Sequence, residues 1–283
     1  MIFDNRPCDL GEGPLWHPIR RQLFWFDITG QRMLSTEKGE ARQWRFPEMV
    51  SAAGWVDRDM LLIAGERDLF LFDVETEETQ TLVELEAGNR STRSNDGRAD
   101  PYGGFWIGTM GKNAEPGAGA IYRYYQGELR QLFKGITVTN AISFTPDGRT
   151  AHFSDSMTRQ VMRVALDAAG WPKGEPELYL DLGDDPSFPD GAVVDAEGLL
   201  WLAQWGASRV SAFAPDGSLV RHVAIEAPNA SCPAFGGQDL TTLFCTSALQ
   251  DMDQAARTAN PNAGMTFMAE GIARGQLEHR VHP

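Results

Sequence analysis

Residues 140–170 read NAISFTPDGRTAHFSDSMTRQVMRVALDAAG, and this stretch contains a unit that recurs along the chain. The unit begins with a polar residue and an apolar patch, followed by a PDG turn and a strand with aromatic residues. A second short strand and another turn complete it. Short β-rich runs separated by Gly, Pro, Asp and Asn are typical of all-β sandwiches, barrels and propellers. Helical periodicity is almost absent, so we expect an all-β fold.

Copies of this unit can be laid out six times along the sequence. They begin near Glu12, Ala53, Asn95, Asn140, Asp190 and Asn229. The spacings of 41, 42, 45, 50 and 39 residues match the roughly 40–50 residues that a four-stranded propeller blade needs. We therefore expect residues 1–283 to form a single domain, a six-bladed β-propeller with four-stranded antiparallel blades around a central channel. The polar segment 253–264 is predicted to be a surface loop.

The composition excludes several classes of partner. The chain has 25 Lys and Arg against 39 Asp and Glu, a net charge of −14, which argues against nucleic acid and against an anionic membrane surface. It has no apolar run long enough to span a bilayer, and its first residues lack the pattern of a secretory signal. Three cysteines without a CxxC pair indicate reduced thiols and a cytoplasmic location. A closed propeller exposes little free strand edge, so a monomer is expected.

The first position of each repeat predicts a cation site. The innermost strands of a propeller surround its axis, so side chains at equivalent positions converge there. Five of the six repeat starts carry a side-chain oxygen, and two of these, Glu12 and Asp190, are carboxylates. Carboxylate and amide oxygens are the ligands that hard or borderline divalent cations prefer. The alternative interpretation is that these residues only start strands and form turns, as Asn and Asp often do.

Other motifs contribute less. Arg93 and Asn95 stand two residues apart, so on an extended strand they point the same way, and an Arg beside a cation could bind substrate or an oxyanion. His17 and His152 stand alone and are interpreted as structural. No HxH, HExxH, GxSxG, GxGxxG or GxxxxGK motif is present, which gives no support to zinc-peptidase, serine-hydrolase or nucleotide-binding chemistry. The tryptophans are interpreted as packing between blades, with Trp205 as a candidate pocket wall.

Four blocks in order, LGEGPLWHP, RSNDGRADPYGGFWIGTM, NAISFTPDGRTAHFSDS and FPDGAVVDAEGLLWLAQW, resemble the SMP-30/gluconolactonase/regucalcin family. The resemblance implies a six-bladed propeller with one divalent metal ion in the central channel and hydrolysis of sugar-acid lactones. It assigns the metal to Glu12, Asn140 and Asp190, and substrate contacts to Arg93 and Asn95. Asn140 is followed by Ala141 where the family usually has glycine. Glu115, in the loop after GTM, loosely resembles a residue on the substrate side.

The expected chemistry follows from these assignments. The ion polarises the lactone carbonyl, Arg93 and Asn95 hold ring hydroxyls or the oxyanion, and Asp190 or a water on the ion supplies the base or nucleophile. Calcium, zinc, magnesium, manganese and iron(II) all suit such ligands, and glucono-, xylono-, arabinono- and galactonolactone are all candidate substrates. The alternatives are an organophosphate or aryl-ester hydrolase, a calcium-binding regulatory propeller and a protein-binding scaffold.

Overall fold

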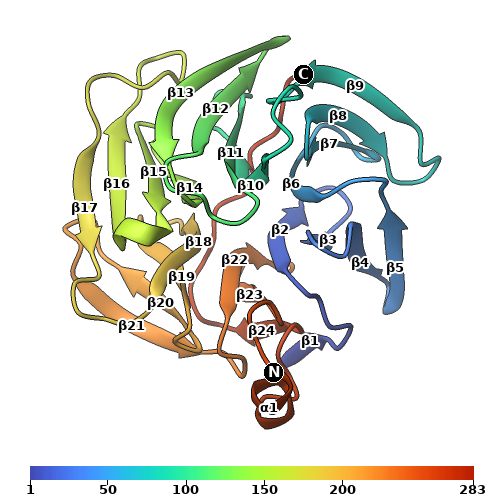
Figure 1. The fold of residues 1–283 in the computed structure, drawn as a ribbon, viewed down its shortest axis with the longest axis vertical. Helices are drawn as coiled ribbons and strands as arrows, with labels where there is room; N and C mark the ends of the chain where they lie inside the picture. Colours follow the sequence, from blue (N-terminus) through green and yellow to red (C-terminus); the bar gives the residue numbers. More distant parts are fainter.

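The computed structural model describes residues 1–283 and consists of six four-stranded antiparallel sheets arranged in a ring (Figure 1). The expected six-bladed propeller is confirmed. Each of the first five blades uses four consecutive strands. These strands are β2 (Gly11–His17), β3 (Gln22–Asp27), β4 (Arg32–Glu37) and β5 (Glu40–Arg45); β6 (Val50–Trp55), β7 (Met60–Gly65), β8 (Asp68–Asp73) and β9 (Thr79–Glu84); β10 (Thr92–Ala99), β11 (Phe105–Gly111), β12 (Gly119–Tyr125) and β13 (Glu128–Ile136); β14 (Thr139–Phe144), β15 (Thr150–Asp155), β16 (Gln160–Ala165) and β17 (Glu177–Asp181); and β18 (Phe188–Val194), β19 (Leu200–Trp205), β20 (Arg209–Phe213) and β21 (Leu219–Ala224).

The sixth blade is assembled from both ends of the chain. Three of its strands are β22 (Ala230–Gly236), β23 (Thr242–Ser247) and β24 (Thr266–Glu270). The fourth is β1 (Ile2–Asp4), which pairs antiparallel with β24 through Ile2 and Phe267 (Figure 1). Phe3 packs edge-on against Trp25 of the first blade and Phe244 of the sixth. The strand β1 therefore closes the ring.

The first strand of each blade lines the channel. The inner strands β2, β6, β10, β14, β18 and β22 each contact the inner strands of both neighbouring blades, so they form a continuous circle. This arrangement brings together residues that lie far apart in the sequence, as the repeat spacing predicted.

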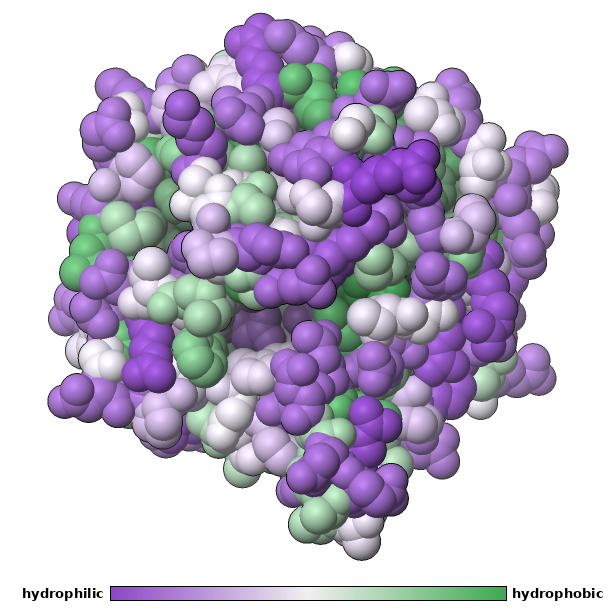
Figure 2. Space-filling model, in the orientation of Figure 1, coloured by the Kyte–Doolittle hydropathy of each residue, from purple (hydrophilic) through white to green (hydrophobic).

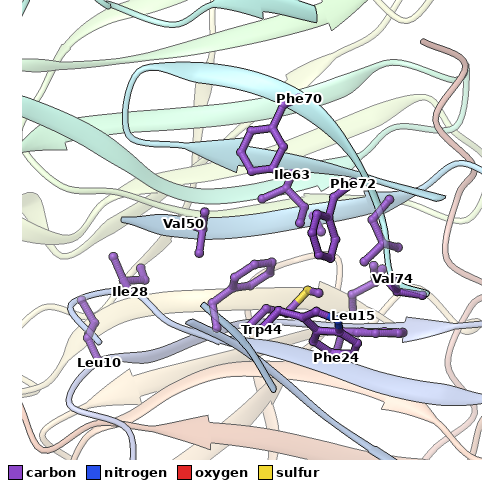
Figure 3. Close-up of a cluster of buried hydrophobic side chains, with 14 of the residues drawn as sticks. Leu10, Leu15, Phe24, Ile28, Trp44, Val50, Ile63, Phe70, Phe72 and Val74 are labelled. Carbon is purple, nitrogen blue, oxygen red and sulfur yellow. The ribbon is translucent and has the colours of Figure 1, made fainter. Parts of the chain in front are cut away.

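Apolar side chains fill the space between neighbouring blades. Figure 3 shows one such cluster, in which Phe24 and Trp44 from the first blade meet Ile63 and Phe72 from the second. The indoles of Trp25, Trp106 and Trp201 are fully buried, which agrees with their predicted role in packing. Each fully buried side chain of this size stabilises the fold by about 2–3 kcal/mol relative to an exposed one.

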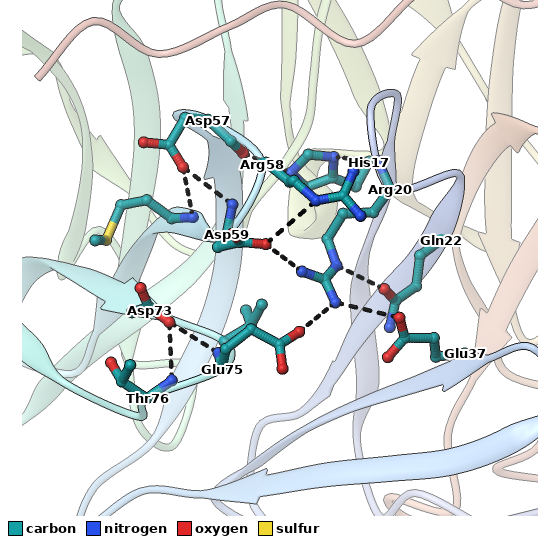
Figure 4. A network of polar contacts seen from close by, with 12 residues as sticks. His17, Arg20, Gln22, Glu37, Asp57, Arg58, Asp59, Asp73, Glu75 and Thr76 are labelled. Atoms are coloured by element: carbon teal, nitrogen blue, oxygen red, sulfur yellow. Dashed lines mark hydrogen bonds and ion pairs between the residues drawn. The ribbon is translucent and has the colours of Figure 1, made fainter.

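A polar network also joins the first two blades, on the turns at the ends of their strands (Figure 4). The guanidinium of Arg20 is ion-paired with Glu37 of its own blade and with Asp59 and Glu75 of the second blade. His17 donates from Nε2 to the Asp57 carbonyl at 2.8 Å, because its Nδ1 accepts the Arg20 backbone N–H. These contacts give His17 a structural role.

Residues 274–283 form a strap across the channel mouth at which the inner strands end (Figure 1, red). Gln276 donates to backbone carbonyls of the fourth and fifth blades. The Glu278 carboxylate forms a buried ion pair with Arg98 on β10, and its carbonyl accepts from Trp55 Nε1 at 2.8 Å. The strap thus contacts several blades and covers this mouth of the channel.

Regular helix is confined to two short segments. They are η1 (Ser156–Thr158), a turn of 3-10 helix after β15, and α1 (Gln254–Ala259), which is capped by the Asp253 side chain. The prediction of a loop over residues 253–264 was wrong for the six residues of α1, where Asp253 satisfies the Ala256 N–H and starts a helical turn. Neither helix is long and apolar enough to cross a lipid bilayer.

Candidate active site

A cavity of about 240 Å³ lies at the other mouth of the channel, where the inner strands begin. The face drawn in Figure 2 is hollowed near the centre of the ring. The cavity is lined by charged and amide side chains at the channel and by apolar side chains nearer the rim. The lining residues are Leu10, Glu12, Arg93, Asn95, Met110, Ala114, Val138, Asn140, Ser156, Met157, Phe188, Pro189, Asp190, Trp205, Gln250 and Asp251.

Local irregularities in the inner strands position the polar residues. In each inner strand the pairing with the second strand shifts register near the cavity. Glu12 and Asn140 are the last paired residues before the shift, whereas Asn95 and Asp190 lie one residue further, inside it. The repeat starts are therefore not strictly equivalent. A bulge redirects side chains locally. Side chains at the last paired position and at the position after it can therefore both face the channel.

Glu12 and Asp190 form a buried carboxyl pair. Each is only 6% exposed, both line the same cavity, and the charge of Glu12 acts directly on Asp190. Burial raises the pKa of both groups; the charge of Asp96 raises that of Glu12 further, and Glu12 and Asp96 do the same for Asp190. Two adjacent buried carboxyl groups need either a shared proton or a cation between them.

Asn140 completes the set of oxygen ligands. Its Oδ1 accepts one hydrogen bond, from Asn95 Nδ2 at 3.2 Å, which leaves a second lone pair. No group of three or more His, Cys, Asp or Glu side chains is arranged to hold a metal ion, and the Asn140 oxygen is a neutral ligand that could join the two carboxylates. Two carboxylates and one amide oxygen match the hard-cation preference and neutralise a 2+ charge. The residues present therefore fit one divalent cation.

Arg93 and Asn95 are linked. Arg93 Nη1 donates to Asn95 Oδ1 at 2.7 Å and to the Ser94 carbonyl at 2.8 Å, and no other N–H of its guanidinium bonds within the protein. Burial lowers the pKa of Arg93 to about 10, so the guanidinium stays charged at neutral pH, beside Glu12 and Asp190. Arg93 thus offers uncommitted donors to the cavity, whereas both N–H groups of the Asn95 amide already bond to the protein.

Sequence reasoning missed two polar residues of the site. Asp96 lies beside the carboxyl pair, its carboxylate accepts the Ile142 N–H at 2.7 Å, and burial raises its pKa to about 6. The NDG turn chemistry of its motif gave no sign of this role. The Gln250 amide lines the cavity without a hydrogen bond to the protein, and its buried Oε1 is unpaired. Gln250 follows β23 and has no counterpart in the repeat pattern.

The remaining predicted positions lie around the site. Asn229 does not line the cavity; its Nδ2 donates to the Gln250 carbonyl at 3.1 Å. Ala53 belongs to a hydrophobic cluster. Glu115 is outside the lining next to Ala114, and its carboxylate accepts hydrogen bonds from the side chain and backbone of Asn113. Trp205 lines the cavity.

Comparisons with known proteins agree on one family. Residues 10–249 match the model of the SMP-30/Gluconolactonase/LRE-like region. A protein of Rhizobium meliloti named "Putative sugar lactone lactonase" is 43% identical over 95% of this chain and 92% of its own length. The L-arabinolactonase of Azospirillum brasilense is 33% identical over 99% of this chain and 94% of its own. The crystal structure of a calcium-binding protein, regucalcin, from Agrobacterium tumefaciens has a TM-score of 0.97 and 38% identity, covering 100% of this chain and 97% of that one.

Proposed function

Because the chain belongs to the SMP-30/gluconolactonase/LRE-like family, we propose that it hydrolyses sugar-acid lactones with the help of one divalent cation. The observation that carries this proposal is the convergence of Glu12, Asn140 and Asp190 with the uncommitted N–H groups of Arg93 in one cavity. In reaction class the chain is a carboxylic ester hydrolase. A cavity of about 240 Å³ suits one small sugar ring, since pockets for drug-sized ligands have volumes of about 300–1,000 Å³.

Asp190, Arg93 and Asn95 have different roles in the reaction. Lactone hydrolysis adds water to the carbonyl carbon and breaks the ring C–O bond, giving a carboxylate and a hydroxyl group. Asp190, a buried carboxylate with a raised pKa, takes the proton from the attacking water and returns it to the ring oxygen as the C–O bond breaks. Arg93 donates to the oxygen on which negative charge develops. Asn95 holds Arg93 in place through its Oδ1.

The cation would be held by Glu12, Asn140 and Asp190. When bound, it supplies Lewis-acid polarisation of the lactone carbonyl. Calcium, zinc, magnesium, manganese and iron(II) all remain candidates, because mixed carboxylate and amide ligands accept each of them. Phe188, Met157 and Trp205 supply an apolar wall suited to the C–H face of a sugar ring.

The proposal is tested by chelating the protein, restoring single divalent metals and measuring hydrolysis of γ- and δ-lactones of pentonic and hexonic acids. We expect hydrolysis only with metal restored. Asp190→Ala should lose at least 100-fold in kcat, whereas Asp181→Ala, which alters an exposed carboxylate on β17, should keep full activity. Phosphotriesters and aryl esters belong in the same panel, and a preference for them would overturn the lactone assignment.

The regucalcin neighbour favours a second role, in which the same ligands bind calcium without turnover. Calorimetry with calcium separates the two roles. Calcium binding by a protein that opens no lactone in the panel would support the second role and contradict the first.

We also propose that the protein works as a cytoplasmic monomer. Cys8, Cys232 and Cys245 are all free thiols in the interior, which suits a reducing compartment. Size-exclusion chromatography with light scattering should give about 31 kDa, the mass of one chain; twice that mass would contradict the proposal.

A further inference from the structure

Ser156 bridges the two strands that carry Asn140 and Asp190. It is the first residue of η1, is only 6% exposed and lines the cavity. Its hydroxyl donates to the Pro189 carbonyl on β18 at 2.7 Å and accepts from Asn140 Nδ2 on β14 at 2.9 Å. No other side chain receives the Asn140 N–H groups.

The hydrogen-bond directions fix which way the Asn140 amide faces. A serine hydroxyl has one proton, and the Pro189 carbonyl can only accept, so the Ser156 proton goes there. Toward Asn140 the hydroxyl must then accept, which requires the NH₂ side of the amide at Ser156. The oxygen therefore faces the channel.

A second chain of contacts agrees from the opposite side. Arg93 can only donate, so it requires the oxygen of Asn95 on its side. The Asn95 NH₂ group then faces the Thr139 carbonyl at 2.8 Å and Asn140 Oδ1 at 3.2 Å. The contact to Oδ1 is long, so the 2.9 Å contact to Ser156 is the stronger restraint on the Asn140 amide.

The turn that carries Ser156 is itself held in place. The Asp155 carboxylate accepts the backbone N–H groups of Thr137, Val138 and Met157. The Ser156 N–H donates to the Val138 carbonyl at 3.0 Å. The hydroxyl is thus presented on a rigid support rather than on a free loop.

We propose that Ser156 is a positioning residue that keeps the Asn140 oxygen directed at the cation. This inference rests on the proposed function. Without the hydroxyl, the amide can turn its NH₂ group toward the cation, which repels it. Groups that orient a metal ligand in this way are worth about 10- to 100-fold in metal affinity.

The test is metal affinity measured by calorimetry, independently of catalysis. We expect Ser156→Ala to weaken binding of calcium, zinc or manganese by about 10- to 100-fold. Ser156→Thr keeps a hydroxyl and should restore most of the affinity. Ser218→Ala, at an exposed serine in a turn of the fifth blade, is the matched control and should bind like wild type.

A double-mutant cycle separates orientation from general damage. In Asn140→Asp the ligand has two equivalent oxygens, so no orienting partner is needed. Ser156→Ala should therefore cost little affinity in the Asn140→Asp background. An equal loss in both backgrounds, or unchanged affinity in Ser156→Ala alone, would overturn the inference. Failure of wild type to bind any divalent cation would instead overturn the proposed function.

Discussion

Replacing Glu278 by alanine removes the only carboxylate that forms an ion pair with Arg98, in the covered mouth of the channel. The Arg98 side chain is 10% exposed and that of Glu278 is 7% exposed. Arg98 Nε is buried without a partner, and its Nη2 has only a 3.4 Å contact to the Ala192 carbonyl. The variant therefore leaves a buried guanidinium without an ion-pair partner, balanced only by the more distant charge of Asp96.

The cost of this change can be worked out from burial. Removing one partner of a buried ion pair costs about 3–5 kcal/mol. For 283 residues the entropy of unfolding is about 0.6 kcal/mol per degree, so the midpoint should fall by about 5–8 °C. Replacing both partners, Arg98→Met with Glu278→Leu, should recover most of this loss, because well-packed apolar groups often substitute for a buried pair at little cost.

The assay is denaturant unfolding followed by tryptophan fluorescence, with lactone hydrolysis measured in parallel. Activity at 25 °C should be retained, since the ion pair lies at the opposite end of the inner strands from Glu12 and Asp190. A loss below about 1 kcal/mol in Glu278→Ala would refute the reasoning, because it would mean that water reaches Arg98. Hydrogen exchange over residues 274–283 would show that directly.

Three further results are expected. Asp96→Asn should flatten the pH dependence of the unfolding free energy of the metal-free protein. Burial raises the pKa of Asp96 to about 6, so in wild type the stability from its protonated form is fully present below about pH 4, and about 2–3 kcal/mol is lost as the pH rises through 6. Denaturation curves recorded from acid to neutral pH would show this loss in wild type and not in the variant. Arg20→Ala should destabilise by about 1–2 kcal/mol, less in 1 M salt, because Asp59 and Glu75 are partly exposed; an unchanged difference in salt would contradict this. Ala141→Gly should change stability by less than about 1 kcal/mol, because relief of its left-handed backbone (φ 57°) is offset by chain entropy and a lost buried methyl; a larger change in unfolding free energy would contradict that balance.

Most of the ring could be predicted from local patterns, because five of the six repeat units start at a polar residue and the units recur at the spacing of a propeller blade. The strand β1 could not, since three residues of sequence IFD carry no periodicity and its partner β24 lies at the other end of the chain. The strap 274–283 is likewise short, polar and irregular. Its place across the channel depends on the ion pair of Glu278 with Arg98 and on hydrogen bonds to residues distant in the sequence, which sequence spacing cannot reveal.

The candidate site also contains some residues that could be predicted from the sequence and others that could not. Glu12, Asn140 and Asp190 could be found because repetition around an axis brings equivalent strand positions together. The shift in pairing register moved Asp190 one residue away from strict equivalence, which a sequence pattern cannot show. Gln250 comes from a connection outside the repeat, and Ser156 acts through hydrogen bonds whose direction only coordinates reveal.

The pairing of β1 with β24 has a consequence for biosynthesis. A ribosome makes β1 before the strands of the other five blades and before β24, so the growing polypeptide exists as an open arc until β24 has been made. During that time β1 has no partner strand, and its backbone groups are exposed to chaperones or to neighbouring nascent chains. A fusion placed before Ile2 is attached directly to β1, so the position of an affinity tag affects the assembly of the sixth blade.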